Sequence, residues 1–351
     1  MPTFLPSGSH ATIVAVAERS IVGVDLGGTN VRARAFSRDG APLSDLASTS
    51  SRATEGLDAV AEAISSVVRA CASNLDAAPE RIGIAAPGHI DGETGTVRWA
   101  PNFGVLVEGV FQNWIDVPLG EAVAARMGAE VVMGNDANLA ALGEYRYGTG
   151  RNAAKGLVLF TLGTGIGGGV VLSPSCVQGE AKGSLVLVGG NGGGGELGHL
   201  VVREGGLDCS AGSYGAVEAY CQRDAIVRRA VYGLQRGRES SLGEAIGNDL
   251  SRVTPKLIAE GADGGDELCQ EVLADVGQVL GVAMGNAINI FAPEVVAVGG
   301  QIALAGEWIL APARRAARSV AIPSLFEFAT IVQAERIDDA GVLGAAALAM
   351  G

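Results

Sequence analysis

Two glycine-rich turns, each joining two predicted strands, constrain the fold of this chain most. The first follows an apolar run over 21–25 and reads Gly-Gly-Thr-Asn over 27–30. The second, over 163–169, follows a strand predicted over 156–161 and holds Thr164 among five glycines. One tight hairpin is common in proteins, but two that open similar stretches indicate an internal duplication. We therefore expect an α/β protein of two lobes.

The length of 351 residues suits two lobes better than one. We expect an N-terminal extension over 1–20, a small α/β lobe over 21–134 plus 336–351, and a large α/β lobe over 135–335. The extension has no basic start and does not resemble a signal peptide. No apolar stretch reaches the ~18 residues needed to cross a bilayer. We expect a soluble protein with no membrane partner.

Charge and cysteine content narrow the function classes. The net charge is −13, and Lys and Arg are scattered, so we do not expect a nucleic-acid partner. Five cysteines, an odd number at wide spacing, argue against a disulfide framework and for the cytoplasm. Only three histidines are present, which excludes a histidine-rich metal centre.

Periodicity predicts an alternation of strands and helices. The predicted strands are 21–25, 31–36, 43–49, 82–86, 97–100, 131–133, 156–161, 170–172, 295–298 and 330–333. The predicted helices are 57–72, 119–127, 139–147, 212–232, 241–260, 265–291, 302 onward and 340–350. We interpret 103–117 and the glycine-rich 178–195 as loops.

The glycine turns have two interpretations. With 53 glycines in the chain, short Gly-x-Gly patterns arise by chance, and each turn alone is equally consistent with ordinary turn chemistry. Alternatively, the glycines expose backbone N–H groups to phosphate oxygens, with Thr29 and Thr164 adding hydroxyl donors. Neither turn is a Walker A loop, since no Gly-Lys-Ser/Thr follows. The pairing of two turns, with Asp25 placed for a magnesium-bound water, favours phosphate binding.

The pair Asn135-Asp136 lies at a predicted strand-to-helix junction. Asn and Asp are favoured N-caps, so the pair is as consistent with a helix cap as with a site. Other polar residues favour a site: Glu196 and His199 lie three apart, Asn102 follows a strand, and Glu218 lies on a predicted helix. Such carboxylates, amides and an imidazole suit a polyhydroxylated ligand.

From residue 21 to the end, the chain resembles the ROK family of sugar kinases and sugar-responsive repressors, and among them the bacterial-type ATP-dependent glucokinases. The motifs that carry this resemblance are Val-Asp-Leu-Gly-Gly-Thr-Asn (24–30), Ala-Pro-Gly (86–88), Ala-Pro-Asn (100–102), Gly-Asn-Asp-Ala-Asn (134–138), the 162–169 hairpin, Gly-Glu-Leu-Gly-His (195–199) and Gly-Gly (299–300).

The resemblance implies a duplicated actin-like ATPase (ribonuclease H-like) fold with a central cleft, and the family's habit suggests a homodimer. It implies phosphorylation of a hexose with Mg-ATP, Asp136 being the general base. The implied sugar-binding residues are Gly88, Asn102, Asn135, Asp136, Glu196, His199 and Glu218. The implied ATP-binding residues are Asp25, Gly27, Gly28, Thr29, Asn30, Thr164, Gly165, Gly299 and Gly300.

One departure from the family concerns its zinc motif, Cys-x-Cys-Gly-x-x-Gly-Cys-x-Glu. The matching stretch, 209–218, keeps Cys209 and Glu218 but has alanines at 211 and 216. A structural zinc takes four ligands, and only His199 and Cys209 of the family's set remain. We predict that there is no structural zinc.

The identity of the hexose stays open. The stretch 114–119 resembles the glucokinase version of its loop and favours glucose at O6 over mannose, fructose, allose or N-acetylmannosamine. Polyphosphate is an alternative donor. A sugar-sensing repressor is the competing class, but about 20 residues precede the first strand, without a helix-turn-helix pattern. An actin-like ATPase acting on proteins would not need the sugar-binding set.

Overall fold

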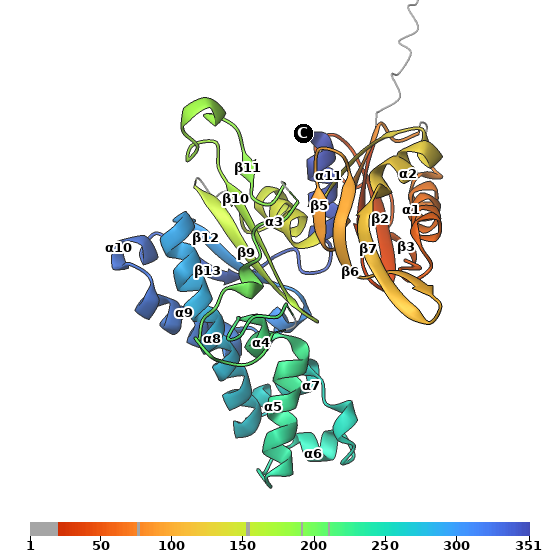
Figure 1. The fold of residues 1–351 in the computed structure, drawn as a ribbon. Helices are drawn as coiled ribbons and strands as arrows, with labels where there is room; N and C mark the ends of the chain where they lie inside the picture. The colour runs from red at the N-terminus through yellow and green to blue at the C-terminus, as the bar shows by residue number, and fades with distance from the viewer. Residues whose placement is uncertain (1–19, 76–77, 152–154, 191, 210) are drawn as a thin grey trace, which may run out of the picture.

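The protein is built on two five-stranded sheets, one on each side of a central pair of helices (Figure 1). The computed structural model describes residues 20–75, 78–151, 155–190, 192–209 and 211–351. The N-terminal extension predicted over 1–20 lies outside the described residues, apart from Ser20. The first sheet contains β1 (Ile21–Leu26), β2 (Asn30–Phe36), β3 (Ala47–Ser50), β4 (Arg81–Ala86) and β8 (Glu130–Asn135). The second contains β9 (Gly156–Leu162), β10 (Ile166–Leu172), β11 (Val186–Leu187), β12 (Val295–Gly299) and β13 (Thr330–Gln333).

The two sheets share one connectivity. Their strand orders are β3-β2-β1-β4-β8 and β11-β10-β9-β12-β13, so the first strand of each unit is central in both. In each sheet an antiparallel hairpin, β1–β2 or β9–β10, is followed by two parallel strands. The duplication expected from the two glycine turns is confirmed at the level of topology.

Helix α11 (Ala340–Met350) joins the two units through α3 (Asp136–Tyr147). It packs on β1 and β4 and against α3, which itself contacts β9 and β10. Glycines permit these close contacts: a Cβ on Gly83 would lie 1.8 Å from Ala345 O, and one on Gly344 would lie 1.6 Å from Leu139 O. The helix therefore packs directly on the neighbouring backbone.

The remaining helices belong to one unit or the other. Helices α1 (Leu57–Ala72) and α2 (Leu119–Met127) pack with the first sheet, and α8 (Glu267–Phe291) and α9 (Glu307–Val320) lie beside the second. Helices α4 (Glu218–Cys221), α5 (Arg223–Gln235), α6 (Leu242–Ala245) and α7 (Pro255–Asp263) extend away from it (Figure 1). Among the described residues, no helix has both the length and the apolar character that a bilayer crossing requires.

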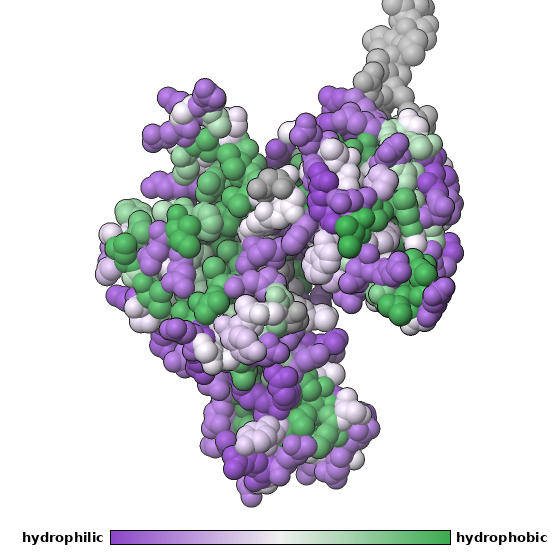
Figure 2. Space-filling view, viewed as in Figure 1, coloured by the Kyte–Doolittle hydropathy of each residue, from purple (hydrophilic) through white to green (hydrophobic). Residues whose placement is uncertain are grey.

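The prediction of a loop over 103–117 was wrong, because this stretch forms most of a β-hairpin. Strands β5 (His89–Asp91), β6 (Thr96–Val107) and β7 (Val110–Val117) form a third sheet. A register shift between Ala100 and Gly104 interrupts the alternation that would have revealed β6. Its turn places Glu108 and Gly109 at φ 51° and 81°, which suits a two-residue hairpin. Exposed apolar side chains gather on this hairpin (Figure 2), including Leu106, Val110 and Ile115.

Two predicted helices are also broken. In place of a helix over 212–232, the stretch begins with turns at Gly212 and Gly215, whose φ angles are 80° and 79°. In place of a helix over 241–260, the short α6 is followed by a 3₁₀ turn and by α7, which begins at Pro255 behind the Thr254 cap. The helix predicted from residue 302 onward is α9, which begins later, at Glu307, after the 3₁₀ turn η4 (Gln301–Ala305).

Candidate active site

Asn135 and Asp136 lie at the carboxyl end of β8, where α3 begins. Asn135 is the helix cap: its Oδ1 accepts the N–H of Asn138 at 3.0 Å. Its Nδ2 donates to Gly88 O at 3.0 Å, which connects the cap to the turn between β4 and β5. The cap and the candidate base are therefore adjacent but separate residues.

Asp136 is a carboxyl group whose environment favours the neutral form. Burial raises its pKa to about 6, and the like charges of Asp25 and Glu196 add to that effect. The backbone N–H of Ala137 donates a hydrogen bond to Asp136 Oδ1 at 2.8 Å, which acts to lower this pKa. A carboxyl group with a pKa close to neutral is suited to accepting a proton from a hydroxyl group.

The two glycine hairpins present open backbone at their tips. In the first, Gly27 N–H donates to Asn30 O at 2.9 Å, and Gly28, Thr29 and Asn30 are exposed. In the second, Gly163 N–H donates to Gly165 O at 3.0 Å, and Thr164 is exposed.

Asp25 lies at the base of the first hairpin. Its carboxylate pairs with Arg32 of β2 and lies beside Gly341, in the first turn of α11. The first hairpin therefore combines exposed backbone at its tip with an ion-paired carboxylate at its base.

The glycine pair Gly299-Gly300 packs onto the second hairpin. Gly300 has φ 80°, and a Cβ there would lie 2.3 Å from Leu162 O, at the end of β9. Only glycine can take this conformation at such a close approach. The residues predicted to contact adenosine are thus joined to those predicted to bind phosphate.

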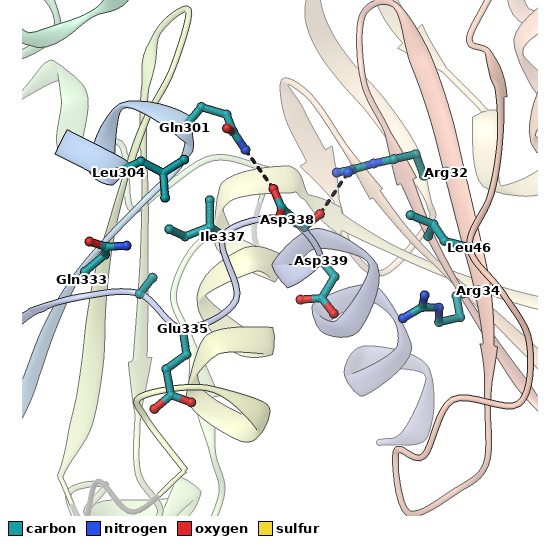
Figure 3. Close-up of a pocket in the computed structure, with 11 residues that line it drawn as sticks. Arg32, Arg34, Leu46, Gln301, Leu304, Gln333, Glu335, Ile337, Asp338 and Asp339 are labelled. Atoms are coloured by element: carbon teal, nitrogen blue, oxygen red, sulfur yellow. Dashed lines mark hydrogen bonds between the residues drawn. The ribbon is translucent and has the colours of Figure 1, made fainter. Parts of the chain in front are cut away.

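A pocket of about 690 Å³ lies between the two units, next to these elements (Figure 3). It is lined from β2 by Arg32, from η4 by Gln301, and by Asp338 in the connection before α11. Arg32 donates to Asp338 O at 2.9 Å and Gln301 Nε2 to Asp338 Oδ1 at 2.8 Å. Asp136 does not line this pocket. The pocket is nevertheless adjacent to the predicted ATP-binding residues, because its lining residue Arg32 pairs with Asp25 and its lining residue Gln301 follows Gly300.

The predicted sugar-binding residues come from both units. Gly88, with φ 92°, packs so tightly that a Cβ would lie 2.1 Å from Trp99 O. Asn102 in β6 has φ 64°, a conformation that is rare outside glycine and occurs at functional sites. Glu196 precedes the 3₁₀ turn η2 (Leu197–His199) and His199 ends it, beside β10.

Glu218 is placed differently from the other sugar candidates. Its Oε2 accepts the N–H of Ile166 at 2.9 Å, in the second glycine hairpin, and the residue is only 8% exposed. Its carboxylate therefore supports the hairpin, in addition to the sugar role predicted for it.

Sequence reasoning assigned no role to Asn138, Glu144 or His89. Asn138 is buried, and its Nδ2 donates to Gly168 O at 2.9 Å and to Gly194 O at 3.3 Å. It thereby connects α3 to β10 and to the glycine-rich segment before Glu196. The one signal in the sequence for a role of Asn138 was its place in the same Gly-Asn-Asp-Ala-Asn motif as Asn135 and Asp136.

Among the described residues, the segment that matches the zinc motif keeps three possible metal-binding groups. These are His199, Cys209 and Glu218, whose ligand atoms lie within 4.8 Å of one another. Cys209 Sγ is 3.6 Å from His199 Nδ1 and 3.9 Å from Glu218 Oε1. A structural zinc is held by four protein ligands, while Ala211 and Ala216 supply none and Glu218 is engaged with Ile166. The described residues thus bring three such groups together, where a structural zinc takes four ligands.

The duplicated sheets and the carboxyl group at the end of β8 define a protein of the actin-like ATPase fold. The sequence profile of the ROK family matches residues 21–351. This chain belongs to the ROK family.

Its relatives include both enzymes and regulators. The glucokinase of Thermotoga maritima is 35% identical over 328 residues, covering 93% of this chain and 96% of that protein. A ROK family glucokinase from Streptomyces griseus, solved with glucose and AMPPNP, has a TM-score of 0.75 at 30% identity and covers 94% of this chain and 99% of its own. The xylose repressor of Caldicellulosiruptor bescii is 28% identical over 267 residues, 76% of this chain and 61% of the repressor.

Proposed function

We propose that this protein is an ATP-dependent hexose kinase that phosphorylates glucose at O6. The observation that carries the proposal is the raised pKa, about 6, of the Asp136 carboxyl group at the start of α3. This group lies near Asp25 of the first hairpin and near Glu196, one of the predicted sugar-binding residues. The similarity to the Thermotoga maritima glucokinase supports a hexose as the phosphoryl acceptor. The Streptomyces griseus enzyme, solved with glucose and AMPPNP, supports glucose and ATP as the two substrates.

Phosphoryl transfer depends mainly on alignment and charge neutralisation. Asp136 orients the sugar hydroxyl and accepts its proton. The N–H groups of the two hairpins, with Thr29 and Thr164, hold the phosphate oxygens. Asp25 would hold a magnesium ion through a water, and the ion would supply positive charge that neutralises the phosphates.

Sugar recognition in this proposal uses Gly88, Asn102, Asn135, Glu196, His199 and Glu218 around the hydroxyl groups of the ring. Because these residues come from both units, sugar binding is expected to draw the units together and to exclude water as phosphoryl acceptor. We place the lobe boundaries for this movement near residues 135 and 335. The proposal includes a cytoplasmic location and a homodimer.

The variant Asp136→Asn tests the role of the base. We expect kcat to fall by about 10² to 10⁴-fold, the usual contribution of a general base, while glucose binding measured by calorimetry is largely kept. Asp224→Asn, which changes an exposed carboxylate on α5 in the same way, is the matched control and should keep wild-type turnover. Near-normal turnover of Asp136→Asn would rule the assignment out.

A coupled assay of a hexose panel with ATP and with polyphosphate decides the substrates. The expected result is fastest turnover with glucose and ATP. Binding of a sugar without turnover by either donor would favour the competing function, a sugar-responsive regulator such as the related xylose repressor.

A further inference from the structure

His89 of the first unit faces Glu196 of the second. The distance from His89 Nε2 to Glu196 Oε1 is 4.0 Å, and both side chains are about half exposed, at 44% and 43%. His89 begins β5, in the sheet of the β6–β7 hairpin, while Glu196 precedes η2 beside β10. The contact therefore crosses between the two units.

The ring of His89 is oriented by its surroundings. It pairs with Trp99 across β5 and β6, and the two ring centroids lie 5.5 Å apart at an interplanar angle of 51°. On its other side is the glycine-rich segment that leads to Glu196: a Cβ on Gly193 would lie 3.5 Å from His89 Cδ2. The same segment contacts the first unit again, where Gly92 N–H donates to Gly190 O at 3.3 Å.

We propose that His89 is a positioning residue for hexose binding, which acts by donating a hydrogen bond from Nε2 to the Glu196 carboxylate. This inference rests on the proposed function, in which Glu196 accepts hydrogen bonds from sugar hydroxyls. The present 4.0 Å exceeds a hydrogen bond by about 1 Å. Closure of the two units on the sugar supplies that approach, and a neutral imidazole has the N–H that is needed.

A fixed carboxylate binds a sugar hydroxyl at a lower entropic cost than one that rotates freely. Glu196 acts on Asp136 through its negative charge, and removal of the His89 ring leaves that charge in place. Loss of His89 is therefore expected to weaken the binding of the sugar, while the chemical step and the binding of ATP stay as they are.

The experiment measures KM for glucose, KM for ATP and kcat in two variants. His89→Phe keeps a ring to pack on Trp99 but removes the donor, and His89→Gln restores a donor near the position of Nε2. We expect KM for glucose to rise roughly tenfold or more in His89→Phe, the value of one hydrogen bond to a charged group. KM for ATP and kcat should change less than about twofold, and His89→Gln should recover most of the wild-type KM.

A double-mutant cycle with Glu196→Gln identifies the partner, because His89→Phe should add little once the carboxylate is gone. Wild-type KM for glucose in His89→Phe, or a full additional effect in the Glu196→Gln background, would overturn the inference. These outcomes leave the proposed function intact if the wild-type protein phosphorylates glucose. Absence of turnover by the wild type with every hexose would overturn both.

Discussion

At the scale of single residues, the junction of β8 and α3 divides two tasks between neighbours. Asn135 caps the helix and reaches Gly88, while Asp136 keeps a carboxyl group with a raised pKa. A carboxylate that also capped the helix would accept more backbone N–H groups, and such bonds lower the pKa of a carboxyl group. The division therefore preserves the basicity that the proposed proton transfer requires.

The pKa of Asp136 predicts the pH dependence of the reaction. Only the ionised form can accept a proton, so kcat/KM should fall roughly tenfold per pH unit below about pH 6. The kcat profile should fall at a lower pH, because the magnesium ion bound with ATP favours the ionised carboxylate. Initial rates measured from roughly 1.5 pH units below that pKa to roughly 2 units above it check both profiles.

The same shift predicts how Asp136 affects folding stability. Its folded pKa of about 6 lies above the ordinary aspartate value of 3.8, so its contribution to stability is fully present below pH 3.8 and is lost as the pH rises to about 6. The ligand-free Asp136→Asn variant should therefore be more stable than wild type above pH 6. Equal stability of the two proteins at about pH 7.5, roughly 1.5 units above this pKa, would contradict the raised pKa of Asp136.

At the scale of elements, the segment from Val201 to Glu218 is held by protein contacts. Val202 N–H donates to Gly215 O at 2.9 Å and Gly215 N–H to Leu207 O at 2.7 Å. Leu207 N–H donates to the hydroxyl of Tyr220 at 2.8 Å, and the guanidinium of Arg203 lies 5.3 Å from the centroid of the Tyr220 ring. These contacts fix the segment on both sides of the altered zinc motif.

We propose that this segment needs no zinc. Metal analysis of protein purified in the presence of zinc should find well under one zinc per chain, and a chelator should leave Tm unchanged. The double variant Ala211→Cys and Ala216→Cys, which restores the family's cysteines, is the positive control and should bind zinc. One zinc per wild-type chain, with a lower Tm after its removal, would sink the proposal.

Elements were predictable where their signals are local. The bounds of α1, α2, α11 and β13 agree with those read from periodicity and turn residues. The β6–β7 hairpin was missed because its bulge interrupts the alternation, and because Pro101 and Asn102 occur more often in loops than within strands. Asn102 lies within this bulge, between the paired residues Ala100 and Gly104, and no local pattern reports its positive φ.

At the scale of the whole molecule, Glu144 bonds to two stretches that lie far apart in the sequence, one after α3 and one before α11. The residue is fully buried near the end of α3. Its Oε1 accepts from Thr149 N at 2.9 Å, Thr149 Oγ1 at 2.8 Å and Glu335 N at 2.7 Å, and its Oε2 accepts from Arg336 N at 2.9 Å. One carboxylate thus connects α3 to the segment that leads into α11.

The variant Glu144→Gln should lower the free energy of unfolding by about 2 kcal/mol or more, because an amide placed among N–H donors leaves some of them unsatisfied. Glu121→Gln changes an exposed glutamate on α2 and should have almost no effect. Urea unfolding of both variants makes the comparison. A loss in Glu144→Gln no larger than in the control would show that the carboxylate does not stabilise this junction.

The sequence by itself determined the α/β class, the duplication, most helices and strands, and membership of the ROK family, because turn residues and periodicity act over a few residues. The tertiary structure decided which side chains meet. It placed Glu218 on the second hairpin, Asn138 between β10 and the glycine-rich segment, and His89 opposite Glu196. These contacts join residues 30 to 107 positions apart, so they follow from tertiary packing and not from any local pattern.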